Sequence, residues 1–233
     1  MKAIFSEYTW KSRFFPCIIS ILPLLVLWAF LSENVKLRDL WAFLSSIKFY
    51  GGVTLSLVFL YSYAQIIRVT SKYFENKYFV KKLGFPTTYL MTYADRTFSE
   101  NYKDKYRQLA KKHFDFDLLY KDEELRNPAE AQKRLNETTK QVILKIKDGQ
   151  LVKKHNIWYG FVRNLIGGTI FSAMFCIINI IVGLTVHKSY LLVILSVILL
   201  VVYVAVFLFH KPILRQNAEA YANQLISEFI SLG

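Results

Sequence analysis

Four long apolar runs, separated by charged or mixed segments, set the pattern of this chain. They cover residues 14–31, 49–67, 165–186 and 190–209. An α-helix rises about 1.5 Å per residue and the hydrocarbon core of a bilayer is about 30 Å thick, so each run is long enough to span it. The pattern therefore predicts an all-α integral membrane protein with four transmembrane helices, arranged as two hairpins.

Between the second and third runs the periodicity is that of short, water-soluble helices. Ser99 has the properties of an N-cap, and apolar or aromatic residues recur at helical spacing as far as His113. Asn127 and Pro128 form a second helix start, an N-cap followed by proline at the first helical position. The stretches 84–98 and 115–126 show no clear period and are predicted to be a loop and an acidic linker. We expect a small helical cytosolic domain between spans two and three.

The residues after the fourth run predict one more helix. Its apolar positions are spaced three or four residues apart: Leu214, Ala218, Tyr221, Leu225, Phe229 and Leu232. Such a stripe is typical of a coiled-coil-like contact or of a helix packed on its own cytosolic domain. A small interfacial helix is also expected in the linker before the second run, near residues 37–44.

These elements divide the chain into four parts. Residues 1–67 form the N-terminal tail and first transmembrane hairpin, and residues 68–160 form the basic helical cytosolic domain. Residues 161–210 form the second hairpin, and residues 211–233 form a cytosolic amphipathic helix. An even number of spans places both termini on the same side of the membrane.

The charge distribution predicts which side that is. The chain has 30 Lys and Arg against 17 Asp and Glu, a formal net charge of +13, although 54% of its residues are hydrophobic. Of these, 21 basic and 12 acidic residues fall between Arg68 and Arg163. Basic residues near span ends favour the cytoplasmic side, so we expect this segment and both termini in the cytoplasm. The excess charge favours contact with the lipid bilayer; nucleic acid is possible but not favoured.

Two of the predicted spans carry a polar stripe. On the second span its members are Tyr50, Thr54, Tyr61 and Gln65. On the third span they are small or polar: Thr169, Ser172, Cys176, Asn179 and Gly183. Two interpretations remain open: the stripes let helices of one bundle pack closely, or several copies assemble and the stripes line a pore. A pore requires a homo-oligomer, because one packed four-helix subunit encloses no wide aqueous path.

The boundary between the basic segment and the third run is a candidate coupling joint. It combines aromatic residues, glycines and a polar pair: Trp158, Tyr159, Gly160, Arg163, Asn164 and Gly167. The plainer interpretation is a membrane-interface anchor; the alternative is that the joint transmits a signal from the cytosolic domain to the membrane helices. Asp95 and Arg96, in the unpatterned loop, are expected to pair with Arg163 or Asn164 and so hold a closed state.

Motifs for catalysis, cofactor binding or metal binding are not found. The sequence lacks a Gly-Lys-Ser/Thr phosphate loop, His-Glu-x-x-His, Cys-x-x-Cys and Gly-x-Ser-x-Gly. Its four histidines are scattered, and Cys17 and Cys176 both lie in apolar runs. A lipid-directed enzyme would rest on Asp115 and Asp117 alone, and no neighbouring group completes such a site. We therefore expect no enzyme activity, no cofactor and no metal.

Several short sequence elements occur together in the central segment. They are Gly84-Phe85-Pro86-Thr87-Thr88, Asp95-x-x-Phe98-Ser99, Lys103-x-Lys105-Tyr106 and Tyr159-Gly160-Phe161-x-Arg163-Asn164-Leu165-x-Gly167. Together they resemble a family of uncharacterised small bacterial four-span membrane proteins, over about residues 84–167. His155 departs from that pattern, since family members usually have an acid before the aromatic run.

The predicted architecture is also similar to that of four-span membrane effectors in bacterial anti-phage defence. This likeness implies a protein that permeabilises or depolarises the inner membrane when a cytosolic protein partner or small signal engages it. Our first hypothesis is accordingly a non-enzymatic, oligomeric membrane effector or channel-like protein. The alternative is a membrane scaffold whose basic cytosolic face recruits a soluble partner, anionic lipid or nucleic acid.

Overall fold

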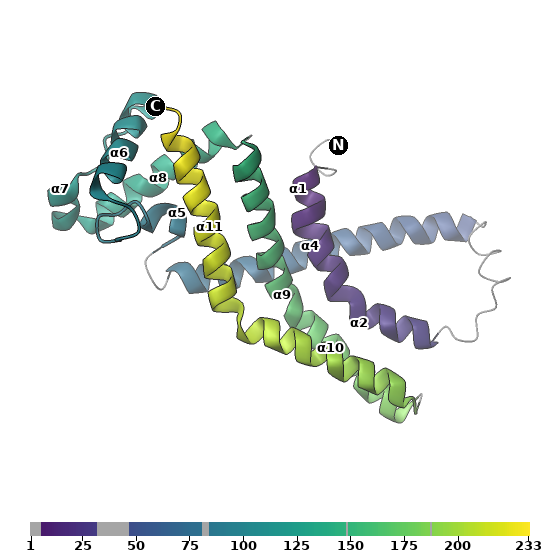
Figure 1. Cartoon of the computed structure of the whole chain (residues 1–233). Helices are drawn as coiled ribbons and strands as arrows, with labels where there is room; N and C mark the ends of the chain where they lie inside the picture. The colour runs from purple at the N-terminus through teal and green to yellow at the C-terminus, as the bar shows by residue number, and fades with distance from the viewer. Residues whose placement is uncertain (1–5, 32–46, 81–83, 148, 187) are drawn as a thin grey trace. The chain divides into compact units, whose positions relative to one another are not determined.

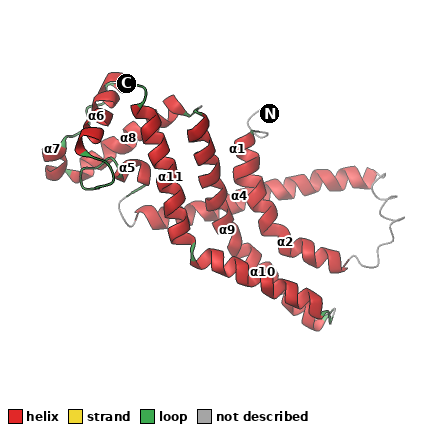
Figure 2. Ribbon diagram, in the orientation of Figure 1, coloured by secondary structure: helices red, strands yellow, loops and turns green. Residues whose placement is uncertain are grey.

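The computed structural model describes residues 6–31, 47–80, 84–147, 149–186 and 188–233 (Figure 1). Every regular element in these ranges is a helix, and they contain no strand (Figure 2). The all-α prediction is therefore confirmed for this part of the chain. The interfacial helix expected near residues 37–44 lies outside the described residues.

Among the described residues, three helical segments are long and apolar enough to cross a membrane. The first is Glu7–Leu31, which consists of α1 (Glu7–Thr9), a π-helical turn η1 (Trp10–Phe14) and α2 (Phe15–Leu31). The others are α9 (Gln150–Thr185) and α10 (Tyr190–Leu208). These helices identify the chain as a membrane protein. The predicted second span belongs to α4 (Ile47–Val80), which is not among the three, and most side chains at its start lie outside the described residues.

The remaining helices are α5 (Pro86–Tyr89), α6 (Glu100–Phe114), α7 (Lys121–Arg126), α8 (Pro128–Ile146) and α11 (His210–Ile230). The predicted starts of α6 and α8 are confirmed by their caps. The Ser99 Oγ accepts a hydrogen bond from the Tyr102 amide, and the Asn127 Oδ1 accepts one from the Glu130 amide at 3.2 Å.

Two stretches predicted to be irregular contain short helices, and here the prediction was wrong. Pro86 opens α5 because its fixed φ suits the first helical position. Helix α7 begins with acidic residues in its first turn, where the helix dipole favours negative charge. The Tyr120 amide also donates to the Glu123 carboxylate at 3.1 Å. Both helices are too short to show a hydrophobic period, which is why the sequence pattern missed them.

The chain forms two compact units, each made of two segments. Unit 1 comprises Met1–Phe74 and Gly160–Lys211, and unit 2 comprises Glu75–Tyr159 and Pro212–Gly233. The C-terminal segment, treated separately in the sequence analysis, belongs almost entirely to unit 2. Helices α4, α9 and α11 each contribute residues to both units.

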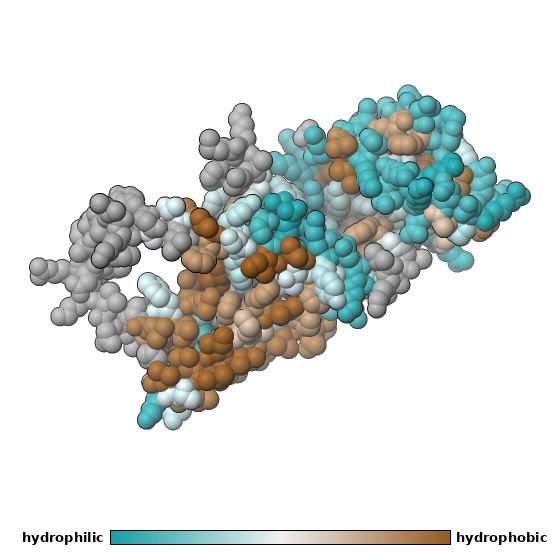
Figure 3. Space-filling view, turned by 180° about the vertical axis from the view of Figure 1, so that it is seen from behind, coloured by the Kyte–Doolittle hydropathy of each residue, from teal (hydrophilic) through white to brown (hydrophobic). Residues whose placement is uncertain are grey.

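Unit 1 has a small core of residues with large exposed apolar surfaces around it. Phe14, Cys17, Ala64 and Ile67 form a buried cluster between the N-terminal helix and α4. Helix α10 buries Leu192, Ser196 and Tyr203 but leaves most of its other apolar side chains exposed. Figure 3 shows apolar residues gathered over the α9–α10 hairpin. Such a surface suits lipid contact, as expected for an outer transmembrane helix.

Unit 2 has a hydrophobic core organised around α11. The predicted apolar stripe of α11 is buried from Leu214 to Phe229, whereas Leu232 is exposed. The Phe229 ring lies 5.2 Å from the Tyr106 ring and is stacked on the Phe114 ring at 5.7 Å. Of the two interpretations of this stripe, packing on the helical domain of the same chain is therefore the one that the structure shows.

Candidate functional site

The candidate coupling joint lies at a close contact between α9 and the N-terminal helix in unit 1. A Cβ atom on Gly160 would lie 2.9 Å from the Ser12 Cβ, and one on Gly168 would lie 3.0 Å from the Ser20 Cβ. Such distances leave no room for a side chain, so glycine is what permits the approach. The two contacts are eight residues apart on both helices, which gives the interface a regular repeat.

Three polar side chains of α9 cross this interface to backbone carbonyls. Asn164 Nδ2 donates to the Ser12 oxygen at 2.6 Å, and Ser172 Oγ donates to the Ser20 oxygen at 3.0 Å. Asn179 Nδ2 donates to the Pro23 oxygen at 2.7 Å. Residue numbers rise in the same order on both helices, so the two helices run parallel.

Helix α4 contacts both of these helices and runs antiparallel to them. Its Leu60 carbonyl lies 3.7 Å from the Cys17 sulfur, and the Tyr63 ring lies 5.8 Å from the Phe171 ring. Further along α4, a Cβ atom on Gly167 would lie 2.9 Å from the Ser71 Cα. Helices α4 and α9 are therefore antiparallel. In this part of unit 1, the N-terminal helix, α4 and α9 all contact one another.

The predicted polar stripes have different environments. Thr169, Ser172 and Asn179 are at most 1% exposed, in the packed interior of unit 1. On α4, Thr54 is exposed, Tyr61 is 45% exposed and Gln65 is half-buried. The Tyr50 side chain lies outside the described residues. The α9 stripe thus occupies a helix–helix contact of a single chain, whereas the described part of the α4 stripe is accessible.

The aromatic part of the joint belongs to unit 2. Trp158 is 56% exposed, and Tyr159 is buried with its ring stacked on the Tyr221 ring at 6.1 Å. The Tyr159 hydroxyl donates to the Glu75 carboxylate. Glu75 is itself only 5% exposed. Sequence reasoning missed Glu75, because an acid at the end of a long helix has the same pattern as a solvated one.

Asp95 and Arg96 lie in unit 2, and Arg163 and Asn164 lie in unit 1. The Asp95 carboxylate accepts a hydrogen bond from the Thr97 amide at 2.8 Å, and its carbonyl accepts one from the Lys103 ammonium. Arg96 is exposed and Arg163 is half-buried. The pairing expected between these two sets of residues stays a prediction.

Unit 2 contains a buried ion pair that the sequence did not reveal. The Arg107 Nη2 lies 2.9 Å from the Glu124 Oε2, and both side chains are almost fully buried. The same guanidinium donates to the Leu119 and Met91 carbonyls and lies 4.1 Å from the centre of the Tyr93 ring. These contacts join α6, α7, the loop between them and the segment between α5 and α6. These contacts satisfy the hydrogen-bonding groups of the buried pair, so its arrangement indicates a structural role.

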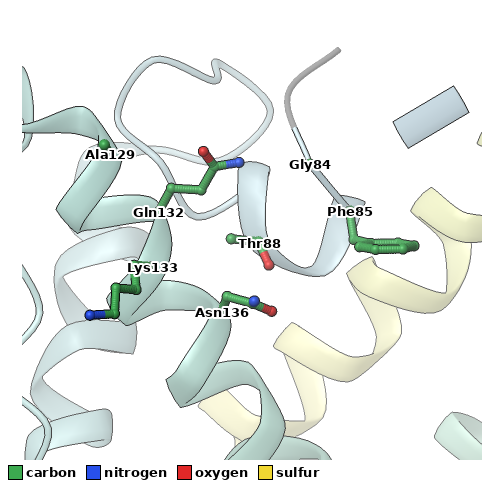
Figure 4. A pocket seen from close by; sticks show the side chains of 7 residues that line it. All are labelled: Gly84, Phe85, Thr88, Ala129, Gln132, Lys133 and Asn136. Atoms are coloured by element: carbon green, nitrogen blue, oxygen red, sulfur yellow. The ribbon is translucent and has the colours of Figure 1, made fainter. Parts of the chain in front are cut away.

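A pocket of about 470 Å³ lies between α5 and α8. It is lined by Gly84, Phe85, Thr88, Ala129, Gln132, Lys133 and Asn136 (Figure 4). In Figure 4 the Phe85 ring and the Lys133 ammonium point away from the space between Gln132 and Asn136. Amide groups and a threonine hydroxyl are therefore its main polar groups, and they can donate and accept hydrogen bonds.

Among the described residues, no group of three or more His, Cys, Asp and Glu side chains is placed to hold a metal ion. Asp115 and Asp117 are both exposed, and Asp117 pairs with Lys111 at 2.6 Å.

Comparison with protein-family models, with curated proteins and with solved structures finds no match to this chain. The helical architecture and the contacts described above therefore carry the functional argument.

Proposed function

We propose that the protein is a non-enzymatic, four-span membrane scaffold of the bacterial inner membrane. In this proposal both termini and unit 2 lie in the cytoplasm, and unit 2 recruits a soluble partner. The observation that carries the topology is the direction of the helices in unit 1, and the surface of unit 2 supports the recruiting role.

The parallel arrangement of α2 and α9 requires the chain between them to cross the membrane. The Asn164–Ser12 hydrogen bond joins the two chains just before their apolar runs, which begin at residues 14 and 165. A chain that leaves α2 at one membrane surface must return to the other before α9 begins. Helix α4 is the long helix described in this interval, it contains an apolar run, and it contacts α9 in the opposite sense. This supports α4 as the second span.

The charge pattern supports a cytoplasmic position for unit 2. Arg13 precedes the first span, and Arg68 follows the second. Arg163 precedes the apolar part of the third span, and Lys211 follows the fourth. In the proposed four-span topology, all four residues lie at the membrane surface that faces unit 2. The positive-inside tendency places that side in the cytoplasm.

A recruiting role fits the basic surface of unit 2. Lysines concentrate at the C-terminal ends of α6 and α8, where Lys112 and Lys145 are exposed and both act electrostatically on His113. Lys147 follows directly after α8 and is also exposed. Lysines at helix C-termini are favourably placed for the helix dipole, so this corner presents positive charge stably. An acidic surface on a soluble protein would complement it.

An oligomeric, channel-like effector of the anti-phage type is the second candidate. The accessible face of α4 favours it, because Thr54 and Tyr61 are exposed there while the α9 stripe is consumed by packing. Copies that met through α4 would bring these side chains together around a common axis. In this version, unit 2 receives the signal and the joint around Asn164 transmits it.

The mass of the nanodisc-embedded protein separates the two candidates. A monomer or dimer, without ion flux in reconstituted vesicles, is expected for the scaffold. A closed assembly of three or more copies that conducts ions would overturn the scaffold and establish the effector. Reversing charge with Lys112→Glu and Lys145→Glu should release the co-purifying partner without changing the number of copies of this chain in the complex. Lys188→Glu, in the turn between α9 and α10 in unit 1, is the matched control.

A further inference from the structure

The N-terminal helix of unit 1 contains two prolines that interrupt its own backbone hydrogen bonds. In an α-helix each amide donates to the carbonyl four residues earlier, but proline has no N–H. Pro16 therefore cannot donate to the Ser12 carbonyl, and Pro23 cannot donate to the Ile19 carbonyl. Pro23 lies inside α2, and Figure 1 shows that the N-terminal helix changes direction along its length. A proline within a helix commonly causes such a kink.

Side chains from two other helices supply the donors that the prolines lack. Asn164 of α9 donates from its Nδ2 to the Ser12 oxygen at 2.6 Å. Tyr203 of α10 donates from its hydroxyl to the Ile19 oxygen, also at 2.6 Å. Asn164 is 2% exposed and Tyr203 is 4% exposed, so both donors are buried. The same arrangement therefore occurs twice: a carbonyl four residues before a proline is bonded by a side chain that is distant in the sequence.

The Tyr203 hydrogen bond lies where the packed part of α2 ends. The buried residues of α2 are Pro16, Cys17, Ser20 and Pro23. None of residues 24–31 is buried, and Leu25, Trp28 and Leu31 are 49%, 63% and 53% exposed. Packing therefore fixes α2 as far as Pro23, and the direction of the segment after it is set at the kink.

We infer that the first span is hinged at Pro23 and that the Tyr203 hydroxyl is the latch that holds the hinge at one angle. Breaking this bond is costly in apolar surroundings, because the Ile19 carbonyl would be left without a donor. Once the bond is lost, residues 24–31 are free to change their angle against α9 and α10. The inference rests on contacts within unit 1, so it does not depend on the function proposed for unit 2.

The test combines Tyr203→Phe, which removes only the hydroxyl, with Pro23→Ala, which restores an amide to the helix. Nitroxide labels on the exposed positions Leu31→Cys and Leu184→Cys report the distance between the end of α2 and α9 by double electron–electron resonance in nanodiscs. We expect Tyr203→Phe to broaden this distance distribution and to lower the unfolding temperature of the full-length protein by about 3 °C. With Pro23→Ala present, the restored amide donates to the Ile19 carbonyl, so adding Tyr203→Phe should change neither quantity.

Tyr190→Phe is the matched control, because it removes a hydroxyl from the same helix at a residue that is 80% exposed. It should leave the distance distribution and the unfolding temperature at the parent's values. Equal effects of Tyr203→Phe with and without Pro23 would overturn the hinge, because the hydroxyl would then stabilise the packing independently of the proline. A distribution that stays narrow in Tyr203→Phe alone would overturn it as well, and this measurement does not require Pro23→Ala to fold.

Discussion

At the residue scale, the two units of this protein satisfy their buried polar groups in different ways. Unit 1 uses short side chains, such as Asn164 and Ser172, that donate to backbone carbonyls of a neighbouring helix. Unit 2 uses an ion pair, Arg107 with Glu124, surrounded by further hydrogen bonds. The difference follows from the surroundings: a charge within a span is far more costly than an amide or a hydroxyl.

His113 provides a residue-scale test of the unit 2 core. Its ring lies 6.0 Å from the Phe229 ring, and its pKa is lowered by burial and by the positive charges of Lys145 and Lys112. A lowered pKa in the folded state means that the unfolded chain binds the proton more readily. Stability is therefore fully present above the usual histidine pKa of about 6.5 and falls as the pH drops below it.

We expect the unfolding temperature of unit 2 to fall between pH 7.5 and pH 5, and His113→Phe to reduce that fall. Phenylalanine keeps an aromatic ring in the contact with Phe229 but does not titrate. The measurement is thermal unfolding of the full-length protein followed by circular dichroism across this pH range. His155→Phe is the control, and an unchanged pH dependence in His113→Phe would refute the assignment.

At the element scale, the parallel contact of α9 with the N-terminal helix dominates unit 1. Glycines permit it, and the eight-residue repeat of Ser12–Ser20 against Gly160–Gly168 sets its register. Gly160 and Asn164, on the α9 side of this contact, were identified from the sequence as part of the candidate joint. Their partner, the N-terminal helix, was not identified, because Ser12 and Ser20 do not set its sequence apart from that of other transmembrane helices.

Gly168→Leu should separate these two helices. A Cβ atom there already lies 3.0 Å from the Ser20 Cβ and 3.6 Å from Ile67 Cδ1, so a larger side chain forces the helices apart. We expect a loss of about 3 kcal/mol in unfolding free energy. The readout is thermal unfolding in nanodiscs.

Gly52→Leu is the control for this change. It places the same side chain in α4, where a Cβ atom would have no neighbour within 4 Å. This variant should keep the parent's stability or raise it slightly, since leucine favours a helix more than glycine does. Equal losses in the two variants would mean that the Gly168 contact does not hold the helices together.

At the scale of the whole molecule, the question is how often the chain crosses the membrane. Three crossings by α2, α9 and α10 alone conflict with the parallel order of α2 and α9, whereas a fourth crossing by α4 resolves it. The native cysteines, Cys17 and Cys176, are buried and free, so added cysteines can be labelled selectively.

We therefore expect Lys105→Cys to react with a membrane-impermeant maleimide only after the cell membrane is permeabilised. Lys188→Cys, in the turn between α9 and α10, should react in intact spheroplasts. An N-terminal tag should be protected together with Lys105→Cys, because both lie on the cytoplasmic side of a four-span protein. Labelling of Lys105→Cys from outside, or on the side opposite to the tag, would rule out the proposed topology.

The sequence by itself determined the helical class, three helices that are long and apolar enough to span a membrane, and the caps of α6 and α8. These features depend on local order: the period of apolar residues, the length of a run, and the preference of serine or asparagine for an N-cap. The buried stripe of α11 was visible for the same reason. Local patterns missed α5 and α7, because helices this short bury too few residues to create a period.

Only the tertiary structure decided how the polar groups of the spans are used. A stripe of Thr169, Ser172 and Asn179 has the same sequence whether it lines a pore or packs on a neighbour; the partner carbonyls at Ser20 and Pro23 lie about 150 residues away. The Arg107–Glu124 pair likewise joins two helices, α6 and α7. Contacts between distant segments arise from packing, which no periodicity within one helix can report.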